Sequence, residues 1–291
     1  PQTARSGNFL AVLALLCAVG MVLAGNPVRE PATVVLALLA GGAAGCLVAV
    51  RVNMIQIPAM VAFQHGAGGI AALLTSFVEL TRNSGDLTAV GQLSGVLGIV
   101  IGAATFSGSM VASAKLASAM RQTPVILPKH DWLLVAVLLG ICTLGVLAGL
   151  AAGPGLLYAS LALILLSIIL GAAFAVRIGG ADMPVLISFL NATAGMAASF
   201  CGIIIQNRLL IACGATVAAS GLILTHAMCR AMNRSLIKLL AGADLTPAAT
   251  VSQNGETAPV PRPASVAAEP QDSPVLAPLS RAVEELRNVP K

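Results

Sequence analysis

Long apolar runs that could each cross a membrane as a helix occupy most of the first 231 residues of this chain. Crossing the hydrocarbon core takes roughly 20 mostly apolar residues, and within lipid a helix satisfies its own backbone hydrogen bonds. The sequence therefore predicts an all-α fold, a polytopic membrane helix bundle with about eight transmembrane helices. The predicted spans are 9–25, 32–50, 58–79, 88–113, 132–152, 156–176, 183–205 and 209–231.

The composition excludes an ordinary water-soluble domain. Of 291 residues, 57% are hydrophobic and only 9% are charged, and the mean hydropathy is +0.94. Aromatic residues make up only 3% of the chain, so small residues must provide the helix packing. GxxxG spacing, which permits close helix contact in lipid, occurs at Gly41/Gly45, Gly91/Gly95 and Gly98/Gly102.

Neither the cysteines nor the excess of basic residues requires a metal site or a nucleic-acid partner. All six cysteines lie in apolar runs and form no CxxC or Cys/His cluster, so we interpret them as packing residues and expect no metal site. The basic residues occur singly between helices, which is typical of membrane orientation. We therefore expect membrane lipid as a partner and no nucleic acid.

Lysine and arginine gather on one side of the predicted bundle. That side receives Arg5, Arg51, Lys115, Arg121, Lys129, Arg177, Arg230, Arg234 and Lys238. The other side receives only Arg29, Arg82 and Arg208. The richer side is expected to be cytoplasmic, which places both ends of the chain in the cytoplasm.

The composition also divides the chain into three parts. Residues 1–242 form the predicted transmembrane domain. Residues 243–278 are rich in Ala, Pro, Ser and Thr, so they predict a flexible, disordered linker. Residues 279–291 regain helical patterning and are typical of the opening of another domain.

A shift of 126 residues aligns the middle of the chain with itself. Arginine, proline and glycine positions coincide: Arg51 with Arg177, Pro58 with Pro184 and Gly69 with Gly195. Four helices separate the copies, so both run the same way through the membrane. This pattern indicates a parallel four-helix repeat about a pseudo-two-fold axis along the membrane normal.

The repeat pairs two polar side chains inside apolar helices, His65 and Asn191. Each lies seven residues past a repeated proline, roughly 10 Å below the cytoplasmic surface. A histidine there can take and release a proton, and Asn191 can orient a water or an imidazole. The sequence predicts a proton relay, with a hydrogen-bonded pair that joins two helices as the alternative.

Charged residues also mark the cytoplasmic helix ends. Asp182 precedes Met183-Pro184 at the start of a span, where an N-cap role is the alternative to a functional one. Arg230 and Arg234 end the last span and suit the helix dipole. The chain shows no Walker motif and no catalytic triad, so its residues point to proton or ion movement rather than covalent chemistry.

Two segments make the sequence specific: GGADMPVLISFLNATAG at 179–195 and GATVAASGLILTHAMCRAMNRSLIKLLAG at 214–242. They strongly resemble the beta subunit of proton-translocating NAD(P) transhydrogenase, and segments 51–80 and 99–116 are similar to that family too. The likeness covers roughly residues 3–240. The GGADMP and MCRAMNRS stretches are the most diagnostic.

The resemblance implies an enzyme that couples hydride transfer between NADH and NADP⁺ to proton movement, with soluble domains that bind NAD(H) and NADP(H). The segment described by this sequence would bind no cofactor itself. The resemblance further implies that His65 and Asn191 match channel positions. Likewise, Asp182 and Arg234 would match residues that communicate with the NADP-binding domain.

The same resemblance implies the partners. They are alpha subunits that carry the NAD-binding domain and further helices, the chain's own NADP-binding domain after residue 291, and a second complete unit in a homodimer. We expect one more spanning helix before residue 1 and a location in the bacterial inner (plasma) membrane.

The chain departs from the family pattern in two places. The family's Asn-Ser-Tyr-Ser-Gly-Trp is Asn-Ala-Thr-Ala-Gly-Met at residues 191–196, and a serine pair in the last helix is Ala219-Ser220. Both changes thin the polar lining of the channel.

Two other functions compete with the proton domain. A secondary transporter of a small solute, built from parallel repeats, should show broken helices and several buried polar groups. A membrane anchor would not need His65 and Asn191 at matched depth.

Overall fold

The structure, a computed structural model of the chain, describes residues 2–25, 30–82, 87–125, 129–150 and 153–232. Every regular element in these ranges is helical, and eight helices are long and apolar enough to cross a membrane. The predicted all-α fold and its eight spans are confirmed. Residue 234, the predicted linker 243–278 and segment 279–291 lie outside the described residues.

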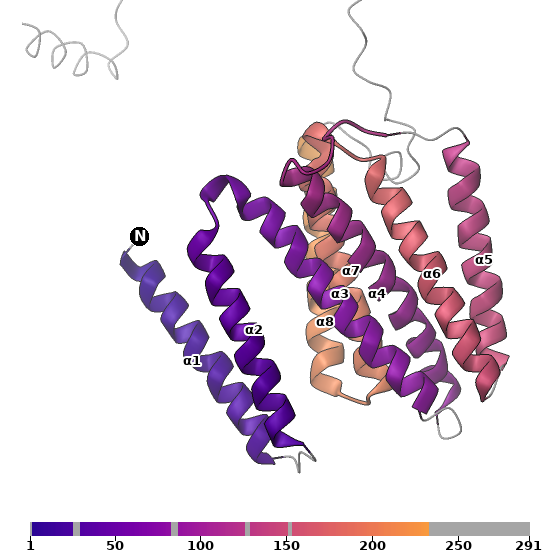
Figure 1. Cartoon of the computed structure of the whole chain (residues 1–291), viewed down its shortest axis with the longest axis horizontal. Coiled ribbons are helices and arrows are strands. Elements are labelled where there is room, and N and C mark those ends of the chain that lie inside the picture. The colour runs from indigo at the N-terminus through magenta and orange to yellow at the C-terminus, as the bar shows by residue number, and fades with distance from the viewer. Residues whose placement is uncertain (1, 26–29, 83–86, 126–128, 151–152, 233–291) are drawn as a thin grey trace, which may run out of the picture. The chain divides into compact units, whose positions relative to one another are not determined.

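The helices follow one another in antiparallel hairpins (Figure 1). Their bounds are α1 Gln2–Gly25, α2 Pro31–Arg51, α3 Ile57–Arg82, α4 Ala89–Leu116, α5 His130–Leu150, α6 Pro154–Val176, α7 Met183–Ile204 and α8 Arg208–Ala231. Two 3₁₀ turns, η1 Met54–Gln56 and η2 Gly180–Asp182, lead into α3 and α7. The helix starts follow local chemistry, since Thr88 caps α4 and Asn207 caps α8 through their side chains.

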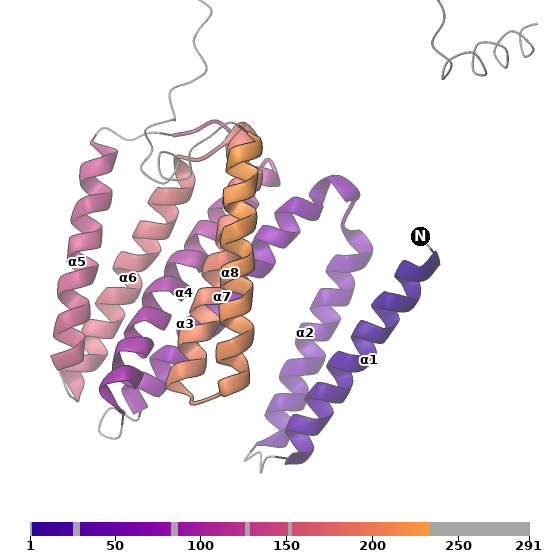
Figure 2. The same ribbon diagram turned by 180° about the vertical axis from the view of Figure 1, so that it is seen from behind.

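Helix α4 is the centre of the bundle. It packs on α3, α6 and α7 and touches α5, while α5 lies on α6 and α8 lies on α7 (Figures 1 and 2). About 61% of its apolar window is buried, the largest share of the eight helices. The core therefore lies on both sides of α4, and the remaining helices are placed relative to it.

Glycines allow the helices around α4 to approach closely. A Cβ on Gly69 of α3 would meet the Gly102 carbonyl oxygen of α4 at 2.9 Å, and one on Gly102 would meet the Gly69 oxygen at 2.7 Å. On the other side of α4, a Cβ on Gly171 would lie 2.1 Å from the Ala104 oxygen. Backbone rather than side chain forms these crossings, as expected for small-residue packing in lipid.

The predicted GxxxG glycines differ in whether they contact another helix. Gly95, Gly98 and Gly102 of α4 all face neighbouring helices, whereas Gly41 and Gly45 of α2 have no atom within 4 Å of a would-be Cβ. Helices α1 and α2 contain no buried residue among those described. The GxxxG spacing alone therefore does not predict which glycines lie at a contact between helices and which are exposed.

The repeat has structural counterparts. The turns η1 and η2 coincide under the 126-residue shift, and so do Gly69 and Gly195, each of which lies at the crossing of its own helix with the next. Ala72 of α3 packs with Ala197 and Cys201 of α7. Ala62 of α3 lies in another cluster with Leu186 and Leu190 of α7, so the shared clusters advance in the same direction along both helices, which run parallel and nearly in register.

The packing does not complete the expected two-fold arrangement. Helix α4 lies against α7, but α8 and α3 form no comparable contact in the described part of the chain. Both helices of the α3–α4 hairpin thus contact α7, the first helix of the α7–α8 hairpin. As a result, α7 packs against α4 and also against α8.

Neighbouring glycines of α3 offer a direct test of the close crossing. Gly69→Ala should lower the free energy of unfolding by about 1–3 kcal/mol, because its methyl group would press on the α4 backbone. Gly68→Ala is the matched control, since no atom lies within 4 Å of its Cβ position. The measurement is the denaturation midpoint in detergent, and equal midpoints for the two variants would contradict the crossing.

Candidate functional site

His65 and Asn191 lie on two helices that are in direct contact. His65 is on α3 and Asn191 is on α7, and both side chains are half-buried. Ala72 lies about two turns beyond His65 and so on nearly the same face of α3. Because Ala72 packs against Ala197 and Cys201, His65 lies on the side of α3 that faces α7, near the level of Asn191.

Neither side chain forms a hydrogen bond with another residue in the described part of the chain. Within the described residues, no hydrogen bond joins His65 to Asn191 or to any other group. The alternative role, a hydrogen-bonded pair that joins two helices, is therefore not formed directly. Both side chains keep their polar atoms available to water or to a proton.

Two hydroxyl pairs between helices flank Asn191 on α7. Thr193 of α7 receives a hydrogen bond from Thr105 of α4 at 2.9 Å. One turn before Asn191, Ser188 accepts a hydrogen bond from Thr225 of α8 at 3.0 Å. These pairs connect α7 to α4 and to α8, and so they fix the rotation of the helix that carries Asn191.

Asp182 ends the η2 turn and precedes α7. Its side chain is 5% exposed, and although it occupies the N-cap position it makes no capping hydrogen bond. The end of α8 lies nearby, because Cys229 packs on Val185. Arg230 of α8 is exposed, and Arg234, the predicted companion of Asp182, lies outside the described residues.

A buried lysine holds the connection that leads to Asp182. Lys115, at the end of α4, is fully buried and donates hydrogen bonds to the carbonyl oxygens of Ala175 at 3.3 Å and Ile178 at 2.7 Å, and to that of Val176. Ala175 and Val176 end α6, and Ile178 lies in the connection that follows it. Backbone amides of Ile178 and Val125 also donate to the Ala175 and Val176 oxygens, so Lys115 adds to the hydrogen bonds that close this helix end. The ammonium group also suits the negative end of the helix dipole.

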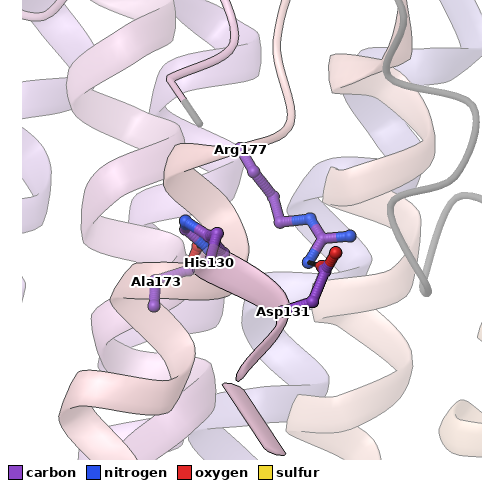
Figure 3. Close-up of polar contacts among 4 residues, drawn as sticks. All are labelled: His130, Asp131, Ala173 and Arg177. Carbon is purple, nitrogen blue, oxygen red and sulfur yellow. Dashed lines mark hydrogen bonds and ion pairs between the residues drawn. The ribbon is translucent and has the colours of Figure 1, made fainter. Parts of the chain in front are cut away.

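Two polar interactions connect the start of α5 to the end of α6 (Figure 3). The His130 ring lies 3.0 Å from the Ala173 carbonyl oxygen, and Arg177 donates to the Asp131 carboxylate at 3.2 Å. We refer to the end of the bundle that carries Lys115, His130, Asp131, Arg177 and Asp182 as the basic end.

From the sequence, Lys115 and Arg177 indicate membrane orientation, Arg177 also matches Arg51 in the repeat, and no role is predicted for His130. The spacing of residues carries no sign that a lysine at the end of one helix reaches the last carbonyls of another. A charged residue inside an otherwise apolar helix end was the one available signal. In the residues searched, no group of three His, Cys, Asp or Glu side chains forms a metal site.

The fold and the polar residues define a class of protein: a multi-pass membrane protein that carries ionisable and amide side chains inside its helix bundle. The model of the NAD(P) transhydrogenase beta subunit family matches residues 1–273. The chain belongs to the NAD(P) transhydrogenase beta subunit family, and thus to the subunits of an enzyme.

Curated relatives agree with this assignment. Two proteins named NAD(P) transhydrogenase subunit beta, both from Rhodospirillum rubrum and one of them from strain ATCC 11170, are 37% identical over 250 residues. The match covers 83% of this chain and 53% of each relative. The chain therefore spans about half the length of the curated relatives it matches.

The role of Lys115 leads to a prediction about stability. Lys115→Met keeps most of the side-chain volume but removes the donors to three carbonyl groups, so it should lower the free energy of unfolding by about 1–3 kcal/mol. Lys129→Met, at an exposed lysine, is the control and should have little effect. The measurement is the thermal unfolding midpoint of each purified protein. An unchanged midpoint for Lys115→Met would contradict the stabilising role of Lys115.

Proposed function

We propose that this chain is the proton-translocating membrane region of a transhydrogenase, and that it couples proton movement to hydride transfer between NADH and NADP⁺ in soluble domains. The observation that carries the proposal is the placement of His65 level with Asn191 on contacting helices, in a chain of this family. His65 is the titrating member of the pair. Asn191 orients the water or the ring through which the proton passes.

The basic end is the proposed point of coupling. Asp182 is buried where α7 starts, and Lys115 fixes the α6–α7 connection just before it. A nucleotide-binding domain that presses on this end acts directly on α7, and α7 carries Asn191. In the proposal, Asp182 and Arg234 transmit the state of the NADP-binding domain to the relay.

The partners and cofactors follow from the same proposal. The complete enzyme adds an alpha subunit with the NAD-binding domain and further helices, an NADP-binding domain, and a second complete unit. NAD(H) and NADP(H) bind to the soluble domains rather than to residues 1–242. The cytoplasmic face of a bacterial inner membrane is the proposed location of the basic end.

A small-solute transporter gains no specific support. One groove among the described helices is lined, apart from Thr105, Asp131, Arg177 and Thr193, by apolar residues and glycines. The described spans are continuous helices, whereas transporter sites use broken helices with several polar groups.

Orientation is tested by accessibility in a cysteine-free background. A cysteine at Arg121 should react only from the cytoplasmic side, and cysteines at Arg82 and Arg208 only from the opposite side, since all three positions are exposed. Labelling is measured with an impermeant maleimide on intact cells and on inverted vesicles. Reaction of position 121 from outside would reverse the proposed topology.

The relay is tested with His65→Ala in the complete enzyme. Because the variant lacks the group that takes up the proton, NADPH-driven proton pumping in vesicles should fall at least about 100-fold, the lower range for a lost proton-transfer group. Coupled turnover should slow, while hydride transfer between the isolated soluble domains continues. Gln64→Ala, at the exposed neighbouring position, is the control. Normal pumping by His65→Ala would remove His65 from the mechanism.

A further inference from the structure

An open groove of about 540 Å³ lies between α5 and α7, against the contact of α4 with α6. Residues from all four helices line it, among them Thr105, Leu138, Gly171, Thr193 and Met196. His65 and Asn191 are not among its lining residues. The groove is therefore a feature separate from the proposed relay, and it lies within the size range of small-molecule sites, roughly 300–1,000 Å³.

The groove is about as deep as one leaflet of a bilayer. Asp131 and Arg177 line it at the basic end, and Met196 lines it deeper in α7. From Met183, where α7 begins, to Met196 the helix rises roughly 20 Å. Half of the hydrocarbon core is about 15 Å thick. The groove thus extends from the membrane surface at the basic end to near the bilayer centre.

The apolar wall and the charged end are complementary to two parts of one molecule. The Arg177 side chain is only 4% exposed, and the one hydrogen bond of its guanidinium group within the described residues goes to Asp131, whose side chain is 80% exposed. A guanidinium group has five N–H donors, so donors remain for another anion. Arginine binds phosphate oxygens well because its fork matches their geometry.

We propose that this groove binds one anionic phospholipid from the leaflet at the basic end. One acyl chain lies along the apolar wall, and the headgroup phosphate accepts hydrogen bonds from Arg177. Figure 3 shows the Arg177 guanidinium group next to Asp131. The Thr105–Thr193 pair at the deep part of the wall satisfies its own hydrogen bonds, so an acyl chain can pass it without leaving a polar group unpaired.

The charged end of the groove favours a phospholipid over a membrane-spanning helix from another polypeptide. Such a helix is mostly apolar and brings no anion to the donors of Arg177, whereas a phospholipid carries a phosphate next to its acyl chains. Thr193 and Met196 line the wall along which the acyl chain would lie.

The acyl-chain part is tested by filling the groove. Leu138 lines it and is 52% exposed, while Leu139, 61% exposed, does not line it. The complete enzyme is delipidated and incubated with equal amounts of phosphatidylglycerol and phosphatidylethanolamine, and bound lipid is counted by native mass spectrometry. Leu138→Trp should lower retention of the tightest lipid about tenfold, equivalent to displacing roughly two methylene groups, whereas Leu139→Trp should retain it.

The headgroup part is tested in the same mixture. Wild-type enzyme should retain phosphatidylglycerol in preference to phosphatidylethanolamine, and Arg177→Gln should abolish that preference. Asp131→Asn, which removes the competing carboxylate, should strengthen the preference and keeps the test decisive if Arg177→Gln does not fold. Equal retention by both tryptophan variants, no lipid preference in the wild type, or a second polypeptide cross-linked at position 138 with no lipid bound would each overturn the proposal.

Discussion

Two helices in a membrane gain little from contact between large apolar side chains, because lipid tails are as apolar as leucine. What holds this bundle together is close backbone approach, and α4 provides it on two sides. Gly102 meets Gly69 of α3, and the Ala104 carbonyl meets Gly171 of α6. The same dependence makes the core sensitive to single methyl groups while it tolerates exposed leucines on the outer faces.

The central position of α4 determines how the polar residues are presented. With α4 against α7, and α3 against both, α3 and α7 run parallel and nearly in register. His65 and Asn191 therefore share a level within the bundle. The hydroxyl pair of Thr105 and Thr193 adds a polar link between α4 and α7 at about that depth, so the helix that carries Asn191 cannot turn without breaking it.

The polar contacts at the basic end differ in strength. The Arg177–Asp131 ion pair involves a carboxylate that is 80% exposed, and such pairs contribute little to stability. Lys115 is fully buried and donates to carbonyl oxygens at the end of α6 and in the connection that follows it. The connection that leads into Asp182 is thus held by Lys115, while the Arg177 guanidinium group pairs with Asp131 and keeps further N–H donors for the proposed anion.

Much of this protein follows from its sequence alone. Runs of apolar residues fix the helices and their number, because only a closed set of backbone hydrogen bonds survives in lipid. The 126-residue repeat predicted the common direction of α3 and α7 and the shared level of His65 and Asn191, since both depend only on helix count and rise per residue. The signatures around Asp182 and Arg230 were enough to indicate the family.

Contacts between helices needed the tertiary structure. Gly41 and Gly102 sit in the same GxxxG spacing, yet only Gly102 faces another helix, because the choice depends on which faces meet. The three carbonyls that Lys115 reaches lie about 60 residues further along the chain, and the groove beside Arg177 exists only where four helices converge. Local periodicity fixes each helix and its faces; which face meets which neighbour is decided by the close fit of surfaces far apart in sequence.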